Sequence, residues 1–203
     1  MKISCKQCRR LGVSVCGRLR CAVQRKPYPP GTSPGRKKRF RRSGSEYGEQ
    51  LREKQIVKFS YGLRERQFRN YVAKSMRVKD GMNIGRLVMF LERRLDNVVY
   101  RLGFGISRHQ SRQIVSHGHI HVNGKRVNIP SYQVKRGDVI MLRPQSRGKG
   151  IFSDIDIRLK KHSVPPWLSF DIKTMAGTVS GIPQSDVFDI PANLNNVIEF
   201  YSR

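Results

Sequence analysis

The chain has 203 residues and carries 41 Lys or Arg against 14 Asp or Glu, which gives a formal net charge of +27 at pH 7. Such a charge favours binding to a dense array of phosphates, so the composition predicts a nucleic-acid partner. No apolar run approaches the ~18 residues that a membrane helix requires, and no hydrophobic signal segment follows Met1, so we expect a cytoplasmic protein without a membrane partner. A cationic membrane-surface protein is the alternative, but the bases do not follow one face of an amphipathic helix.

The positive charge is concentrated in the first three quarters of the chain. Residues 1–45 hold fourteen bases and no acid, residues 46–150 hold twenty-two bases and eight acids, and residues 151–203 hold five bases and six acids. The N-terminal part is poor in apolar residues, whereas the remainder is long enough to bury a core. We therefore expect a basic N-terminal segment attached to one or two compact domains.

All four cysteines lie near the N-terminus, at Cys5, Cys8, Cys16 and Cys21. Two close pairs can each chelate, and a turn between them can bring four thiolates into a tetrahedron. Neighbouring bases favour thiolates and offset the negative charge of a four-thiolate centre. We predict one structural zinc ion, whose binding supplies the folding free energy of this short segment. An iron–sulfur cluster, or free or disulfide-bonded cysteines, are the alternatives, and a catalytic zinc is disfavoured because four thiolates leave no open position.

Residues 26–45 predict an irregular basic arm. Repeated Pro and Gly preclude a helix, and six bases occupy the seven positions of residues 36–42. A run of this kind is either a solvated segment without a partner or an arm that RNA orders, and the charge of the rest of the chain favours the RNA-bound arm.

Helical patterns follow the arm. Ser45 can cap a helix whose first turn carries two acids, and after a break at residues 61–62 the apolar stripe of residues 63–76 predicts a second helix. Apolar residues then repeat at helical spacing over residues 87–102, and Gly103 ends this segment. The first half of the chain is therefore expected to be mainly helical.

The pattern changes to that of strands after a short helix over residues 108–117, which Ser107 can cap. Asn123-Gly124 lies between alternating apolar residues, which is the strongest hairpin signal in the chain. Further strands are expected within residues 134–142, a turn leading into a strand within residues 165–172, and a closing helix over residues 193–201.

No catalytic grouping can be identified, so we predict that the chain is not an enzyme. Three histidines alternate along residues 117–121, but no nearby carboxylate or cysteine completes a metal site, and contact with RNA or exposure to solvent is favoured. Asp96 is expected to orient Arg93 or Arg101 rather than to act as an acid.

A compact basic surface is predicted around the short helix and the hairpin. Arg108 and Arg112 lie one helical turn apart and project from one face, and Lys125 and Arg126 follow the Asn-Gly turn. This set fits an RNA backbone or a distorted junction. The alternative is a pair of ordinary surface arginines.

Longer runs of the sequence resemble the bacterial small-subunit ribosomal protein S4 family. These runs span Ser45–Gly48, Gln50–Gln55, Glu65–Tyr71, Arg94–Phe104, Ile129–Gln133 and Glu199–Arg203. The similarity extends from the cysteines to the last residue, and runs of this length are far more specific than a short motif. The four cysteines match the zinc-binding type of the family, although only seven residues separate the two pairs, fewer than in zinc-bearing relatives.

The resemblance implies an α+β fold of three parts. Residues 1–45 form a four-cysteine zinc knuckle and basic arm. Residues 46–94 together with 192–203 form an all-helical domain. Residues 95–191 form an inserted small α/β module, the S4 RNA-binding domain, with a hairpin-containing sheet. Within this module, residues 144–164 are shorter than in relatives that carry an additional helix.

The resemblance also implies the function of a structural constituent of the small ribosomal subunit, present as a monomer. Such a protein binds ribosomal RNA early at a multi-helix junction of the 5′ domain and nucleates assembly. The arm would lie where messenger RNA enters and is unwound, and an interface with ribosomal protein S5 would tune decoding accuracy. The expected RNA-binding residues are Arg9, Arg10, Arg36, Lys37, Lys38, Arg39, Arg41, Arg42, Arg52, Lys54, Arg66, Arg69, Arg108, Arg112, His119, Asn123, Lys125 and Arg126.

Two other classes of protein compete with this interpretation. An RNA-modifying enzyme that carries an S4 module would need a catalytic domain with its own core, and no stretch of this chain is long enough to hold one. A zinc-dependent DNA-binding regulator would need a recognition helix or dimer symmetry, and the sequence indicates neither.

Overall fold

A computed structural model describes residues 3–18, 20–31, 45–78, 81–148, 150–160, 162–171 and 174–202. The basic arm predicted at residues 36–42 lies outside these ranges. The chain divides into two compact units, which we call unit 1 (residues 1–87 and 189–203) and unit 2 (residues 88–188). Within the described residues, no helix combines the length and the apolar character that crossing a membrane demands.

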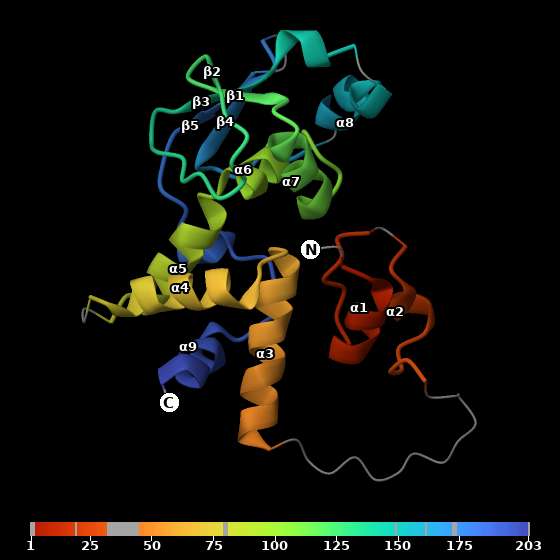
Figure 1. Ribbon diagram of the computed structural model, residues 1–203, viewed down its shortest axis with the longest axis vertical. Helices are drawn as coiled ribbons and strands as arrows, with labels where there is room; N and C mark the ends of the chain where they lie inside the picture. Colours follow the sequence, from red (N-terminus) through yellow and green to blue (C-terminus); the bar gives the residue numbers. More distant parts are fainter. Residues whose placement is uncertain are drawn as a thin grey trace. The chain divides into compact units, whose positions relative to one another are not determined.

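Unit 1 is built from helices (Figure 1). They are α1 (Cys5–Leu11), α2 (Ala22–Arg25), α3 (Glu46–Ser60), α4 (Glu65–Met76) and α9 (Leu194–Ser202), and α5 (Asn83–Glu92) runs across the boundary between the two units. The predicted cap of α3 is confirmed, because the Ser45 hydroxyl accepts a hydrogen bond from the Gly48 N–H at 3.2 Å. The second helix and the closing helix are confirmed as α4 and α9.

The core of unit 1 brings helices that are far apart in the sequence together. α9 packs on both α3 and α4. Val57 of α3, Phe68 of α4 and Val197 of α9 are fully buried, and the Phe68 ring meets the Tyr201 ring edge-on at 6.0 Å between centroids. The C-terminal helix is therefore an integral part of this helical unit.

Unit 2 contains a five-stranded antiparallel sheet with the strand order β2-β1-β3-β5-β4. The strands are β1 (Ile120–Val122), β2 (Lys125–Arg126), β3 (Val139–Leu142), β4 (Leu168–Asp171) and β5 (Ala176–Val179). The hairpin prediction is confirmed: Val122 pairs with Lys125, and both turn residues have positive φ, 51° at Asn123 and 78° at Gly124. Asn and Gly adopt this conformation at little cost, which is why the turn forms at this dipeptide.

One face of the sheet forms the core of unit 2. Ile120, Ile140 and Leu142 from the strands are buried together with apolar residues of α6 (Leu95–Arg101) and α7 (Arg108–Ser116). The α7 cap is confirmed, because the Ser107 hydroxyl accepts a hydrogen bond from the Gln110 N–H at 3.3 Å. Alternation along β1 and β3 places every second side chain in this core.

The single helical segment predicted over residues 87–102 is wrong, because the helix is interrupted between α5 and α6. Arg94 has an extended conformation and forms an antiparallel bridge with Gln133. The Val134 N–H donates to the Arg93 carbonyl at 2.9 Å, and the Leu95 N–H donates to the Tyr132 carbonyl at 2.8 Å. Long-range backbone pairing thus replaces helical hydrogen bonds at a point where the apolar spacing continues unbroken.

Residues 144–164 contain a helix that the sequence pattern did not indicate. Two 3₁₀ turns, Pro144–Ser146 and Gly150–Phe152, precede α8 (Ile155–Lys160). Phe152, Ile155 and Leu159 from these elements are buried in the core of unit 2. This short segment therefore contributes three apolar side chains to the core of unit 2.

Candidate metal centre and nucleic-acid interface

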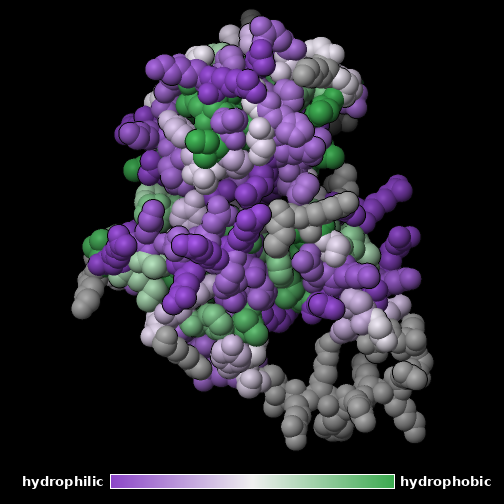
Figure 2. Space-filling model, in the orientation of Figure 1, coloured by the Kyte–Doolittle hydropathy of each residue, from purple (hydrophilic) through white to green (hydrophobic). Residues whose placement is uncertain are grey.

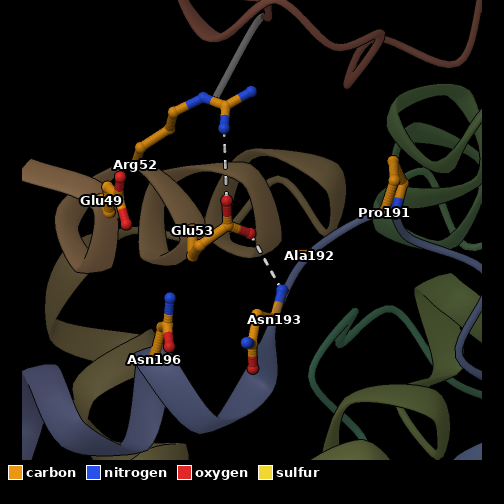
Figure 3. Close-up of a pocket in the computed structure, with 7 residues that line it drawn as sticks. All are labelled: Glu49, Arg52, Glu53, Pro191, Ala192, Asn193 and Asn196. Atoms are coloured by element: carbon orange, nitrogen blue, oxygen red, sulfur yellow. Dashed lines mark hydrogen bonds and ion pairs between the residues drawn. The ribbon is translucent and has the colours of Figure 1, made fainter. Parts of the chain in front are cut away.

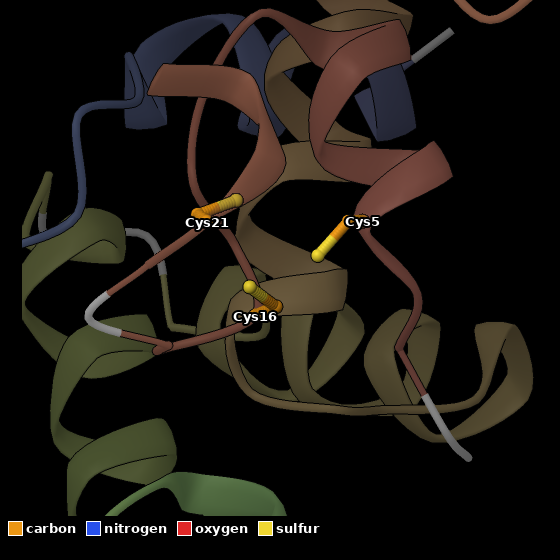
Figure 4. Close-up of side chains that lie close together, drawn as sticks. All are labelled: Cys5, Cys16 and Cys21. Carbon is orange, nitrogen blue, oxygen red and sulfur yellow. The ribbon is translucent and has the colours of Figure 1, made fainter. Parts of the chain in front are cut away.

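Three cysteine thiols of the N-terminal segment point toward a common space (Figure 4). The Sγ atoms of Cys5, Cys16 and Cys21 all lie within 4.8 Å of one another. Cys8 does not belong to that group, but it is fully buried in the same segment, and its thiol donates to the Ser4 carbonyl at 3.9 Å. The three grouped thiols can therefore bind a metal ion, and Cys8 lies in the same short segment.

The thiols differ in how readily they ionise. Burial raises the pKa of Cys8 to about 12, and its hydrogen bonds with Cys16 and Cys21 act in the same direction. Burial also opposes ionisation of Cys21, but hydrogen bonds from the Ser14 hydroxyl, the Val23 N–H, and the thiols of Cys16 and Cys8 outweigh it and lower the pKa of Cys21 to about 7. A cation placed among the thiols would favour thiolates at all four positions, since metal binding and deprotonation are coupled.

Backbone turns and arginine contacts shape the cysteine segment. Gly12 ends α1 in the left-handed conformation, with φ at 73°, which turns the chain toward Cys16. Arg9 donates to the carbonyls of Lys26, Tyr28 and Pro29 at 2.9–3.3 Å and lies over the Tyr28 ring. The guanidinium of Arg9 thus fastens the end of the segment to α1.

Unit 2 brings the predicted arginines of α7 together with side chains of α6. Arg108 Nε donates to Asn97 Oδ1 at 2.8 Å, and its guanidinium lies 4.7 Å from the centroid of the Tyr100 ring. Arg112 Nη1 lies 3.9 Å from Asp96 Oδ2, and 27% of the Arg112 side chain is exposed. The two arginines therefore have defined positions on a partly exposed face.

The hairpin adds further bases. Lys125 and Arg126 are exposed, and Arg126 Nη2 donates to the His117 carbonyl at 3.4 Å. The guanidinium of Arg126 lies over Gly118, where an added Cβ would collide with it. Asn123 is used internally instead: its amide donates to Asp138 Oδ1 and accepts from the Val139 N–H, both at 2.9 Å. Its role in the structure is to fix the turn.

Two of the predicted RNA-binding residues are buried, which corrects the prediction for them. Lys54 is 5% exposed, its ammonium donates to Glu65 Oε1 at 2.9 Å, and it lies over the Phe200 ring. His119 is 7% exposed and forms a 2.9 Å hydrogen bond with the Ser146 hydroxyl. Neither side chain is accessible to RNA in this conformation, because each is used in packing within its own unit.

The remaining predicted bases fall into three groups. Arg52 is occupied structurally, since its Nε and Nη2 donate to the Leu11 carbonyl at 3.0 and 2.9 Å and so connect α3 to α1. Arg10, Arg66 and Arg69 are exposed. The bases of the arm, Arg36, Lys37, Lys38, Arg39, Arg41 and Arg42, lie outside the described residues. Figure 2 shows hydrophilic residues over much of the visible face, with smaller hydrophobic areas between them.

Sequence reasoning missed a group of buried charges at the junction of α5 and α6. Glu92 is completely buried and accepts two hydrogen bonds from the guanidinium of Arg101, at 2.9 and 3.0 Å. Arg94 is also completely buried and donates to both carboxylate oxygens of Asp96, at 3.0 and 2.6 Å. Burial raises the pKa of Asp96, and the charges of Arg94 and Arg112 oppose that rise.

These pairs correct the expectation that Asp96 orients Arg93 or Arg101. Asp96 is the partner of Arg94 and Arg112, whereas Arg101 belongs to Glu92. The sequence signal for the missed pairs is the set of charged residues inside an apolar helical pattern, because a charge at a core position requires a partner.

A small pocket in unit 1 lies between α3 and the start of α9 (Figure 3). It has a volume of about 430 Å³ and is lined by Glu49, Arg52, Glu53, Pro191, Ala192, Asn193 and Asn196. Glu53 spans it, accepting from Arg52 Nη1 at 3.4 Å and from the Asn193 N–H at 2.9 Å. Glu53 is therefore the residue that links α3 to the start of α9 across this pocket.

Comparison with known proteins identifies two families along the chain. Residues 2–92 match the ribosomal protein S4/S9 N-terminal domain, and residues 93–140 match the S4 domain. Small ribosomal subunit protein uS4 of Thermotoga petrophila is 46% identical over 206 residues, covering 98% of this chain and 96% of that protein. The proteins of the same name from Thermus thermophilus and Dehalococcoides mccartyi are 45% and 40% identical, with the same coverage.

Proposed function

Because this chain belongs to the ribosomal protein S4 (uS4) family, we propose that it is a structural constituent of the small ribosomal subunit that binds ribosomal RNA and has no enzymatic activity. The observation that carries this proposal is the similarity to uS4 proteins over 98% of the chain. The net charge of +27 agrees with a polyanionic partner. The expected location is the small ribosomal subunit in the cytoplasm.

The RNA-binding surface that we propose in unit 2 consists of Arg108 and Arg112 on α7 together with Lys125 and Arg126 on the hairpin. The two arginines occupy one face of a helix, and the two hairpin residues are exposed. Basic side chains at defined spacing recognise phosphates and the shape of a folded RNA rather than a base sequence. Arg10, Arg66 and Arg69 extend the proposed contacts to unit 1, and the buried Lys54 and His119 are left out.

We propose that the cysteine cluster holds one zinc ion through Cys5, Cys8, Cys16 and Cys21. Tetrahedral zinc bonds thiolates at ~2.3 Å, which brings the sulfurs to roughly 3.8 Å from one another. Three of the thiols already lie within 4.8 Å of one another, so a small contraction would bring them to this spacing, and the buried Cys8 thiol of the same segment would supply the fourth ligand. The ion would stabilise the fold of residues 3–31 and would take no part in chemistry.

Three finer assignments rest on the family resemblance. The first is early binding at a multi-helix junction of the 5′ domain, which would nucleate assembly of the subunit. The second is contact of the arm, residues 36–42, with messenger RNA where it enters the subunit. The third is an interface with ribosomal protein S5 that affects decoding accuracy. We also propose residues 95–191 as the inserted RNA-binding domain and residues 46–94 with 192–203 as the helical domain.

Binding of the purified full chain to a small-subunit ribosomal RNA transcript tests this function. We expect protection of 5′-domain nucleotides from chemical probes, with an affinity that falls steeply as salt rises. An equimolar 3′-domain transcript of similar length is the control for unspecific cation binding. Equal affinity for both transcripts would contradict a specific ribosomal role.

A further inference from the structure

The side chains behind the two α7 arginines form a connected network on α6. Asn97 is buried, and its amide nitrogen donates to the Glu92 carbonyl at 3.1 Å and to Glu92 Oε2 at 2.9 Å, while its amide oxygen accepts from Arg108 Nε at 2.8 Å. These three contacts leave one orientation for the amide, with its oxygen toward Arg108. Glu92 is itself held by Arg101, so the chain of contacts begins at a buried ion pair.

The second arginine is held through the neighbouring residue. Asp96 accepts from Arg94 with both carboxylate oxygens, and one of these oxygens also lies 3.9 Å from Arg112 Nη1. Arg94 is completely buried, so its bidentate contact fixes the carboxylate. Consecutive residues of one helix thus contact the two arginines that lie one turn apart on the next helix.

Asn97 and Asp96 can orient the two α7 arginines without fully neutralising them, so the arginines can still bind a phosphate. Asn97 is a neutral amide, so its hydrogen bond directs Arg108 without contributing a countercharge. The Tyr100 ring adds a flat surface 4.7 Å from the Arg108 guanidinium, which restricts the plane of that group. Asp96 shares its charge between Arg94 and Arg112, and the closer partner is Arg94 at 2.6 Å.

We propose that α6 is a positioning element for RNA recognition, in which Asn97 and Asp96 hold Arg108 and Arg112 at a fixed separation for adjacent phosphates. This inference rests on the proposed function and names residues that act through the arginines. An arginine that is already ordered loses less side-chain entropy when it binds, so the network raises the affinity without touching RNA.

A double-mutant cycle on the full chain tests the proposal, with a 5′-domain ribosomal RNA transcript as the probe. Asn97→Ala should weaken binding about two- to tenfold, since the Arg108 side chain must then be ordered when RNA binds, while the slope of log affinity against log salt stays unchanged. Arg108→Gln should weaken binding and also lower that slope by about 0.7–0.9, the value for one phosphate contact. In the Arg108→Gln background, Asn97→Ala should have no further effect on affinity.

Ser146→Ala is the matched control for the loss of a buried polar contact, because it removes a buried hydrogen bond to His119 elsewhere in unit 2. It should lower the thermal stability and leave RNA affinity within twofold of the wild type. Multiplicative effects of Asn97→Ala and Arg108→Gln would overturn the proposal, because Asn97 would then act through general stability. If Asn97→Ala fails to fold, Asn97→Ser, which retains a short acceptor, takes its place in the cycle with the same criterion. Failure of the wild type to bind the transcript would instead contradict the proposed function.

Discussion

The N-terminal segment, residues 3–31, and unit 2 both present basic side chains, but they are stabilised in different ways. In the N-terminal segment the described buried apolar residues are few, namely Ile3, Val15 and the cysteines Cys8 and Cys21. Unit 2 buries eighteen described apolar residues of its helices, strands and loops in one continuous cluster. The N-terminal segment therefore contains a group of neighbouring thiols, whereas unit 2 contains an apolar core.

This difference determines how each region can lose its structure. A segment with so little apolar burial cannot offset its chain entropy, so its fold depends on cross-links such as thiolate–metal bonds and on contacts such as those of Arg9 and Arg52. Unit 2 depends on apolar burial, which no chelator removes. Metal removal and core mutation should therefore separate the two regions experimentally.

The largest effect is expected from removing the metal ligands. Replacing all four cysteines by serine should unfold residues 3–31, because bound structural zinc contributes on the order of 10 kcal/mol to the folding of such a segment. Amide hydrogen exchange of α1 and α2 should become fast, while exchange in β1, β3 and β5 stays slow.

Chelation provides the matched control for the serine variant. A zinc chelator should reproduce the fast exchange of α1 and α2 in the wild type and should change nothing in the four-serine variant. Protected amides in residues 3–31 after complete metal removal would show that polar contacts alone hold this segment, and the contrast with unit 2 would disappear.

The next effect is the converse experiment in unit 2. Phe104 is fully buried and meets the Phe170 ring edge-on at 5.6 Å between centroids. Phe104→Ala should destabilise unit 2 by about 3–5 kcal/mol, as is usual for truncating a buried aromatic residue. Denaturant unfolding measures this loss, the zinc content per chain should stay constant, and Ile106→Ala, at a 63% exposed position nearby, is the control. Loss of zinc in Phe104→Ala would indicate that the regions are not independent.

Most of the fold could be predicted from the sequence because its signals are local. The Asn123-Gly124 turn and the caps at Ser45 and Ser107 each depend on side chains within three residues, and all three form as predicted. The break before α6 could not be predicted, because it is caused by backbone pairing of residues 93–95 with residues 132–134, some forty positions later. Apolar spacing contains no information on such a distant strand.

In the candidate sites, too, local features could be predicted from the sequence and long-range contacts could not. Cysteine spacing was enough to identify the thiol cluster, since its three cysteines are close in sequence. Counting bases, in contrast, could not separate the partly exposed Arg112 from Lys54, which Glu65 and Phe200 hold in the core of unit 1. Whether a lysine faces solvent there depends on α9, which comes from the other end of the chain.

A smaller effect, on RNA affinity, is expected from a substitution in the proposed RNA-binding surface of unit 2. This effect should not depend on the metal. Arg112→Gln should weaken binding to a 5′-domain transcript about five- to tenfold and lower the salt slope by about 0.7–0.9, as for the loss of one phosphate contact. Arg136→Gln, an equal change of charge at an exposed turn of the same unit, is the control. Metal-free protein should show the same loss for Arg112→Gln, and equal effects of both substitutions would instead indicate unspecific attraction.

The smallest effect is expected from a polar contact between the helices of unit 1. Neither the N-terminal segment nor unit 2 has this contact. Glu65 accepts hydrogen bonds from Lys54 at 2.9 Å, from Lys58 at 2.8 Å and from the Tyr201 hydroxyl at 2.7 Å. Burial opposes its ionisation, but the hydrogen bonds from Lys58, Tyr201 and Lys54 outweigh it and lower the pKa of Glu65 from 4.5 to about 2.

A carboxyl whose pKa is lower in the folded state stabilises the fold above its unfolded pKa and loses that contribution as the pH falls toward the folded value. The stabilisation by Glu65 should thus be complete above pH 5 and lost between about pH 4.5 and pH 2. Because 47% of the Glu65 side chain is exposed, solvent screening limits the contribution to about 1 kcal/mol. The free energy of unfolding of the wild type should therefore exceed that of Glu65→Gln at pH 6 and converge with it near pH 2. If the difference in the free energy of unfolding between the wild type and Glu65→Gln is constant over this range, Glu65 acts through packing. If the two values converge, unit 1 has an acid-sensitive contact that neither the thiol cluster nor the core of unit 2 provides.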